Sequence, residues 1–179
     1  MHHGLGLYGR YQHRVLHAYV SLAGLTRYPV IGQAVRWTAN LYARFGHSGY
    51  SLTLAEAEQI VDSAKSVSLG PCSCRSEFRN CSQSAMSEIV LGDGSSHVYA
   101  SREKLLRPIS REEAKEVLRA AHGNHLAQSI MRCGDHFYAI CSCCSCCCVP
   151  LRLRTKFGIG LALVRNPSVV EDFQRMQLK

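Results

Sequence analysis

Six cysteines stand within the eight residues from Cys141 to Cys148, and this block constrains the fold more than any other feature of the chain. The chain has ten cysteines in 179 residues; three more are grouped at Cys72, Cys74 and Cys81, and Cys133 stands alone. Neighbouring thiolates repel one another and oxidise readily unless a cation holds them. We therefore expect the fold to bring cysteines from both groups around a metal.

A disulfide scaffold is the other common use of many cysteines, and the length of the chain argues against it. A chain of 179 residues, 46% of them hydrophobic, can bury a core without covalent cross-links. No apolar run is long enough to predict a membrane span, and no signal peptide is evident. We expect a cytoplasmic protein, with contact to a membrane surface as an alternative. In a reducing compartment, clustered cysteines bind metal or undergo redox chemistry.

The spacing of the cysteines bears on which metal is bound. A structural zinc ribbon has two separate Cys-x-x-Cys pairs, whereas the first group here has Cys-x-Cys and a third thiol seven residues later. The second group contains Cys-x-x-Cys in three overlapping registers, which favours a 4Fe–4S cluster, because its iron corners face different directions. Zinc and unligated redox-active thiols remain as alternatives. The expected ligands, for one cluster or two, are Cys72, Cys74, Cys81, Cys141, Cys143, Cys144, Cys146 and Cys147.

The segment from about 52 to 148 resembles a known family. The stretches "LTLAEAEQIVDSAKSVSLGPCSCRSEFRNC", "PISREEAKEVLRAA" and "HFYAICSCCSCCC" are similar, in this order, to the cysteine-rich region upstream of the ferredoxin domain in bacterial and archaeal 4Fe–4S ferredoxin-type proteins. The resemblance implies a 4Fe–4S cofactor and a role in electron transfer. Two departures stand out: Glu88 lies near the place of a further family cysteine, and no ferredoxin motif follows in 149–179. A partner would then have to supply the rest of an electron relay.

Local patterns predict an α+β fold in three parts. These are a basic amphipathic helical arm at 1–50, a cysteine-rich metal or iron–sulfur domain at 51–150, and a basic tail with a short helix at 151–179. In the arm, apolar residues recur at helical spacing over about 11–25 and 30–45. Pro29 separates the two helices and suits the start of the second.

Capping residues mark two helices in the middle part. Thr53 and Ser110 each precede a glutamate by three residues, which is the spacing of a capping box. Short apolar runs predict strands, one of them at 97–100, and a hairpin that turns at 133–135. We expect each cysteine group to follow the end of a strand. Arg152, Arg154 and Lys156 alternate along the tail, which predicts a strand or an extended segment there.

The arm carries positive charge only. The net charge of the chain is +8, and its first 55 residues contain no acidic residue but five arginines, Arg10, Arg14, Arg27, Arg36 and Arg44. The second arm helix has one apolar face, formed by Val30, Ala34, Trp37, Leu41 and Phe45. Such an arm either packs on the rest of the chain or docks an acidic partner. We expect docking to a protein redox partner or a larger complex, with a membrane surface as an alternative and nucleic acid less favoured.

Two further inferences concern the chemistry of the chain. Arg75 directly follows the first cysteines and is expected to neutralise the negative charge of a thiolate-ligated cluster; a solvated arginine beside Glu77 is the alternative. Cys133 and Cys148 are expected to be buried as small apolar residues. No nucleotide-binding glycine pattern or nucleophile–base arrangement is present. We therefore expect a non-catalytic electron-transfer subunit rather than an enzyme. The alternative is a zinc-organised binding module that contacts nucleic acid or a protein assembly.

Overall fold

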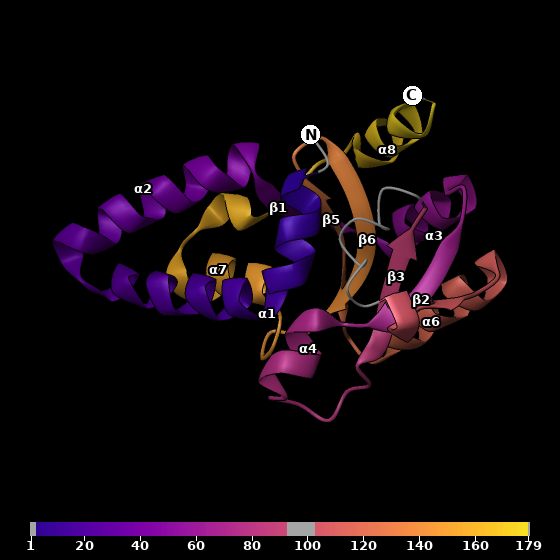
Figure 1. Ribbon diagram of the computed structural model, residues 1–179, viewed down its shortest axis with the longest axis horizontal. Coiled ribbons are helices and arrows are strands. Elements are labelled where there is room, and N and C mark those ends of the chain that lie inside the picture. The colour runs from indigo at the N-terminus through magenta and orange to yellow at the C-terminus, as the bar shows by residue number, and fades with distance from the viewer. Residues whose placement is uncertain (1–2, 93–102, 179) are drawn as a thin grey trace.

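A mixed β-sheet lies between two groups of helices in the computed structural model, which describes residues 3–92 and 103–178 and side chains from Arg10 onward (Figure 1). The strands are β1 (His47–Leu52), β2 (Val67–Pro71), β3 (Met86–Leu91), β4 (Arg107–Pro108), β5 (Ala127–Cys133), β6 (His136–Cys143) and β7 (Leu163–Arg165). The α-helices are α1 (His3–Ala23), α2 (Pro29–Phe45), α3 (Leu54–Ser63), α4 (Ser73–Phe78), α6 (Arg111–Gly123), α7 (Val149–Phe157) and α8 (Val169–Gln177). This architecture confirms the α+β prediction. The strand predicted at 97–100 lies outside the described residues.

The sheet is centred on the hairpin that the sequence predicts. Its strands lie in the order β4-β2-β3-β6-β5-β1-β7, and neighbours run antiparallel except β1 and β7. The β5–β6 hairpin turns at Gly134, whose φ of +57° is a conformation that glycine adopts without strain. On the other side of β6, Glu88 of β3 pairs with Cys141. The register therefore sets this glutamate beside the second cysteine group.

Alternation along the strands sends apolar side chains to both faces of the sheet. On one face, Ile89, Ile130 and Ile140 are fully buried in the core formed with α3, α6 and α8. On the other face, Tyr138 of β6 is buried with cysteines of the same strand, beneath the arm. Side chains two residues apart on a strand share a face, so Cys141 and Cys143 both point toward the arm.

The arm helices cover that second face together with α7 (Figure 1). Both helices form as predicted, and α1 begins further toward the N-terminus than expected. Arg36 of α2 donates to the carbonyls of Thr26 (2.8 Å) and Phe157 (3.3 Å), and the Asn40 side chain accepts from the Leu161 N–H (2.8 Å). The arm is therefore held on the domain by specific polar contacts. Within the described residues, the helices are too short or too polar to cross a bilayer.

The segment after the cysteine block is helical, so the strand or extended segment predicted from Arg152, Arg154 and Lys156 is wrong. Pro150 stands in the first turn of α7, where its missing N–H removes no helical hydrogen bond. An alternation of basic residues this short cannot distinguish a strand from a helix. In α7, the Arg152 guanidinium lies 4.9 Å from the centre of the Phe78 ring. This contact joins α7 to α4.

Both predicted capped helices form. The Ser110 hydroxyl accepts from the Glu113 N–H (3.1 Å), but the Glu113 carboxylate pairs with Arg107 (2.6 Å) instead of completing the capping box. The division of the chain near 50 and 150 stays a prediction. Strands from all three predicted parts share the sheet, because β1 pairs with β5 on one side and with β7 on the other.

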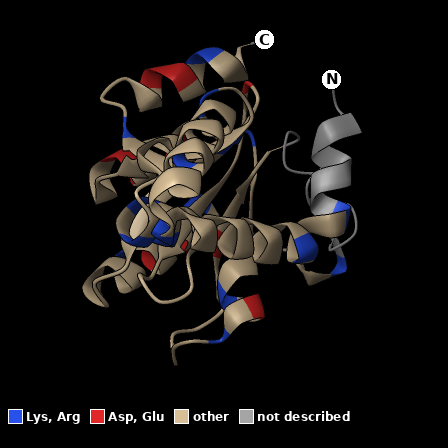
Figure 2. Cartoon of the chain, turned by 90° about the vertical axis from the view of Figure 1, so that its left-hand side faces the viewer, with Lys and Arg blue, Asp and Glu red and all other residues tan. Residues whose placement is uncertain are grey.

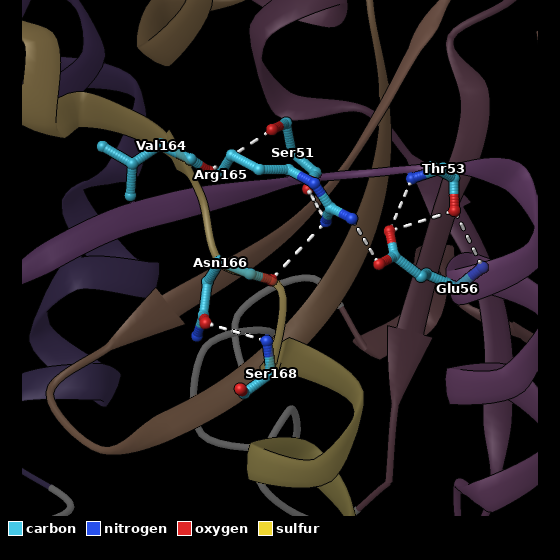
Figure 3. A network of polar contacts seen from close by, with 7 residues as sticks. All are labelled: Ser51, Thr53, Glu56, Val164, Arg165, Asn166 and Ser168. Atoms are coloured by element: carbon cyan, nitrogen blue, oxygen red, sulfur yellow. Dashed lines mark hydrogen bonds and ion pairs between the residues drawn. The ribbon is translucent and has the colours of Figure 1, made fainter.

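A polar network joins the start of α3 to β7 (Figure 3). The Glu56 carboxylate accepts from the Thr53 N–H (2.8 Å), and the Thr53 hydroxyl accepts from the Glu56 N–H (3.3 Å), which completes a capping box. The other carboxylate oxygen pairs with Arg165 (2.5 Å), which also donates to the Ser51 carbonyl (3.2 Å). Hydrogen bonding by Arg165 is the main cause that lowers the pKa of Glu56.

Glu56→Gln is expected to lower the free energy of unfolding at neutral pH by about 0.5–1 kcal/mol, because the ion pair is partly exposed and glutamine keeps the capping hydrogen bond. The carboxyl of Glu56 has a lower pKa in the folded than in the unfolded state. The contribution of this carboxyl to the free energy of unfolding is therefore present above its pKa in the unfolded state, about 4.3. It disappears as the pH falls through its pKa in the folded state.

Urea unfolding, followed from neutral pH into acid, measures this difference. The wild-type and Glu56→Gln curves are expected to converge as the carboxyl is protonated. Glu116→Gln, exposed on α6, is a matched control that should stay within about 0.5 kcal/mol of the wild type. If the difference in free energy of unfolding between wild type and Glu56→Gln is unchanged in acid, the charge of Glu56 is not its source.

Candidate metal centre

Four cysteine sulfurs from two distant segments converge at one place. Cys81 follows α4, and Cys144, Cys146 and Cys147 lie between β6 and α7. All four sulfurs lie within 4.8 Å of one another. The Cys81 sulfur is 3.8 Å from those of Cys144 and Cys147, and the Cys146 and Cys147 sulfurs are also 3.8 Å apart. This group, called the four-thiol centre below, could hold a metal ion.

Backbone and side-chain contacts fasten the Cys81 segment to the other three thiols. Helix α4 ends at Phe78, and the residue that caps it, Arg79, has a left-handed conformation with φ of 48°. The next residue, Asn80, donates its backbone N–H to the Cys147 sulfur (3.3 Å). Its side-chain amide donates to the Cys146 carbonyl (3.0 Å). Sequence reasoning did not single out Asn80, and its position beside Cys81 is the one signal that could have found it.

A buried arginine ties together the elements that carry the thiols. Arg75 of α4 is only 3% exposed. Its guanidinium donates to the Ser84 carbonyl, to the Ser87 hydroxyl (2.9 Å) and to the Ser142 carbonyl (2.7 Å). These contacts link α4 to β3 and β6. The alternative of a solvated arginine beside Glu77 is therefore wrong.

The same guanidinium is the positive charge next to the cysteines. Burial lowers the pKa of Arg75, but Cys72, Cys144 and Cys81 outweigh this effect, and its pKa is raised above the usual value. The predicted role of Arg75 in neutralising thiolate charge fits this placement. A cation that cannot lose its proton suits a site where several thiols must be deprotonated.

The thiols of the centre hold their protons unequally. Burial by itself would raise the pKa of Cys144, but hydrogen bonds from Cys146, the Cys147 N–H, Arg75 and Cys81 outweigh it and lower the pKa to about 6. Burial is the main cause that raises the pKa of Cys147 to about 12, and it also raises that of Cys146. Cys144 therefore loses its proton more readily than Cys146 and Cys147 do. Metal binding would displace protons from the other ligands.

The remaining cysteines of the two groups line a separate cavity. It has a volume of about 540 Å³, lies between the arm and the sheet, and is mostly apolar. The thiols in its wall are those of Cys72, Cys74, Cys141, Cys143 and Cys148. Of the eight predicted ligands, Cys81, Cys144, Cys146 and Cys147 come together, and Cys72, Cys74, Cys141 and Cys143 line this cavity instead.

The cavity thiols are held differently from those of the centre. The Cys148 sulfur is 3.1 Å from that of Cys143, and the Cys141 thiol donates to the Glu88 carboxylate (3.4 Å). Burial first, and then the charge of Glu88, raise the pKa of the Cys72 and Cys141 thiols well above the usual value. The Cys72 and Cys141 thiols therefore keep their protons at neutral pH.

Two smaller predictions concern the other cysteines. Cys148 is buried, as expected, with its sulfur against another thiol. Cys133, at the end of β5, is only half-buried, because it lies beside the exposed turn of the hairpin.

Neither a protein-family model, nor a curated protein sequence, nor a solved structure matches this chain.

Proposed function

We propose that the four-thiol centre holds a single metal ion, with zinc the best fit, and that the chain works as a metal-organised binding subunit. The separation of the sulfurs carries this proposal. Sulfurs bound tetrahedrally to one ion at about 2.3 Å stand about 3.8 Å apart, and three sulfur pairs of the centre are 3.8 Å apart. Four protein ligands would leave no open position, which is typical of a structural rather than a catalytic zinc site.

An iron–sulfur protein that transfers electrons is the second candidate. It is supported by the resemblance of 52–148 to ferredoxin-type proteins and by the five further thiols in the cavity wall. The buried charge of Arg75 would also suit a cluster, since hydrogen bonds and charge near the sulfurs set its potential. A 4Fe–4S core spaces its ligand sulfurs more widely than one ion does. The four thiols would therefore have to move apart, or the cavity thiols would have to take part.

Metal and sulfide analysis of anaerobically purified chain separates the two candidates. The single-ion proposal predicts one tightly held zinc per chain at the four-thiol centre and no acid-labile sulfide. The iron–sulfur candidate predicts a brown protein with iron and sulfide, whose visible absorption dithionite bleaches. Protein that contains neither metal, and that takes up neither on anaerobic reconstitution, would overturn both.

The arm supplies the surface through which we propose that the subunit docks. Val30, Trp37 and Phe45 of α2 are 85%, 68% and 70% exposed, so the apolar face singled out in the sequence points away from the domain. Arginines are the only charged residues on α1 and α2 (Figure 2). Exposed apolar patches bordered by charge are typical of protein interfaces. An acidic protein surface is the partner that this chemistry favours.

The double variant Trp37→Ser/Phe45→Ser is expected to fold and keep its metal but to lose the partner that co-purifies with the wild type. Leu105→Ser/Leu178→Ser removes exposed apolar side chains elsewhere and is the matched control. Binding should weaken with salt, because exposed charges are screened over about 10 Å at 0.1 M. A wild-type chain that remains a monomer without a partner at low salt would contradict docking. Binding to anionic vesicles or to nucleic acid instead would show that the partner is not an acidic protein.

A further inference from the structure

A second group of metal-ligating side chains lies on the arm, away from the cysteines. His13 and His17 are four residues apart on α1, so both imidazoles lie on one face of the helix, with ring centres 5.4 Å apart. Glu77 of α4 faces both: one carboxylate oxygen contacts His13 Nδ1, and the other is 2.6 Å from His17 Nε2. One ligand atom from each residue lies within 4.8 Å of the other two.

Neighbouring contacts hold the two helices in this arrangement. The Ser73 hydroxyl of α4 donates to the Gln12 side chain of α1 (2.9 Å), next to His13. The His17 ring packs against the Phe78 ring, with centres 5.0 Å apart. The ligand atoms are therefore brought together by packing before any ion binds, which lowers the entropic cost of binding.

The acidic ligand of this group stands alone in its part of the sequence. Glu77 is the only carboxylate between Asp62 and Glu88, and the arm that it contacts has none. The His13 and His17 side chains, which share this carboxylate, are 67% and 52% exposed and so reachable from solvent. Two histidines four residues apart on a helix, with a carboxylate from another element, form a known pattern of zinc ligation.

We propose that His13, His17 and Glu77 bind a divalent first-row transition ion, with zinc as the best fit and water in the remaining position. Imidazole and carboxylate ligands suit zinc, cobalt and nickel, whereas the four-thiol centre selects thiophilic metals. The bound ion would clamp α1 of the arm onto α4. Because Glu77 lies four residues before Cys81, it would join the arm to the segment that carries one ligand of the four-thiol centre.

Anaerobic titration of the full chain with Co²⁺ tests this site. Cobalt bound by thiolates shows intense sulfur-to-metal charge-transfer absorption in the near ultraviolet, and cobalt bound by imidazole and carboxylate does not. We expect one bound equivalent per chain that adds no charge-transfer absorption. In His17→Gln and Glu77→Gln, this equivalent should bind at least about 100-fold more weakly, because even residues outside the ligand shell contribute 10–100-fold to affinity.

His122→Gln, which removes an exposed imidazole from α6, is the matched control and should retain the additional cobalt. Hydrogen exchange gives a second readout: zinc should slow exchange of α1 amides in the wild type and in His122→Gln, but not in Glu77→Gln. Equal cobalt binding by wild type and Glu77→Gln would overturn the proposal. So would a wild-type titration in which every bound cobalt adds charge-transfer absorption. That absorption reports the cysteine site separately, so failure of one site is distinguishable from failure of the other.

Discussion

A chain carrying Cys144→Ser is expected to lose the metal proposed for the four-thiol centre and to lose stability with it. The pKa of Cys144 is lowered to about 6, and serine would remove one of the four proposed ligands. We expect the metal affinity to fall by more than about 100-fold. Ligation of Cys81 and Cys144 to one ion closes a loop of 63 residues. Loss of that closure costs about 4 kcal/mol by the chain-entropy estimate used for cross-links.

Two further cysteine variants make this result specific. Cys133→Ser, which lies away from the centre, should keep both the metal and nearly all of the stability. Cys72→Ser should keep the metal as well, because Cys72 lines the cavity rather than the four-thiol centre. Metal content by elemental analysis and unfolding in urea, with and without a chelator, measure the two effects. Full metal content in Cys144→Ser, or loss of metal in Cys72→Ser, would place the ligands elsewhere.

Arg75→Met is expected to lower the free energy of unfolding by about 3 kcal/mol and to weaken metal binding by about 10–100-fold. Methionine is a similarly long side chain, but it leaves the Ser84 and Ser142 carbonyls without their donor. Each buried acceptor that is left without its donor costs about 1–3 kcal/mol, and the metal loses a nearby positive charge. For a chain of this size, 3 kcal/mol corresponds to a melting temperature lower by about 6–12 °C.

Two other arginine substitutions show which property of Arg75 matters. Arg75→Lys keeps the charge but cannot reproduce the fork of donors, so an intermediate loss is expected. Arg79→Met, four residues further on and exposed, should stay within about 0.5 kcal/mol of the wild type. Thermal unfolding of the metal-loaded and metal-free forms separates the stability effect from the metal effect. An Arg75→Met chain as stable as Arg79→Met would show that the buried guanidinium contributes little.

Local chemistry determined the elements that the sequence predicts correctly. A hydroxyl three residues before a glutamate stabilises a helix start wherever it occurs, and Thr53 and Ser110 both cap helices. Gly134 allows the tight turn of the hairpin, and Pro29 sets the boundary between the arm helices. These signals depend on a few neighbouring residues, so they can be read without the rest of the fold.

The amphipathic pattern of the arm also depends only on neighbouring residues. Which face of the arm helix packs on the domain depends on distant ones. Val30, Trp37 and Phe45 share a helix face, yet that face points to solvent, while Ile31 and Val35 on another side line the cavity. Helix α2 carries apolar residues on more than one side, so periodicity by itself cannot tell which side packs. That choice depends on contacts with residues more than a hundred positions away, such as the bond from Arg36 to Phe157.

The density of cysteines by itself determined that thiols crowd together in this chain, in a group that could hold a metal ion. Neighbouring thiolates repel one another and oxidise readily unless a cation holds them. Which thiols meet was decided by the tertiary structure. Strand β6 runs through Cys143 because it pairs with β5, so Cys141 and Cys143 point toward the arm, while Cys144, beyond the strand, turns toward Cys81. Sequence spacing does not encode where a strand ends or which distant loop reaches it, since both depend on pairing and packing across the whole sheet.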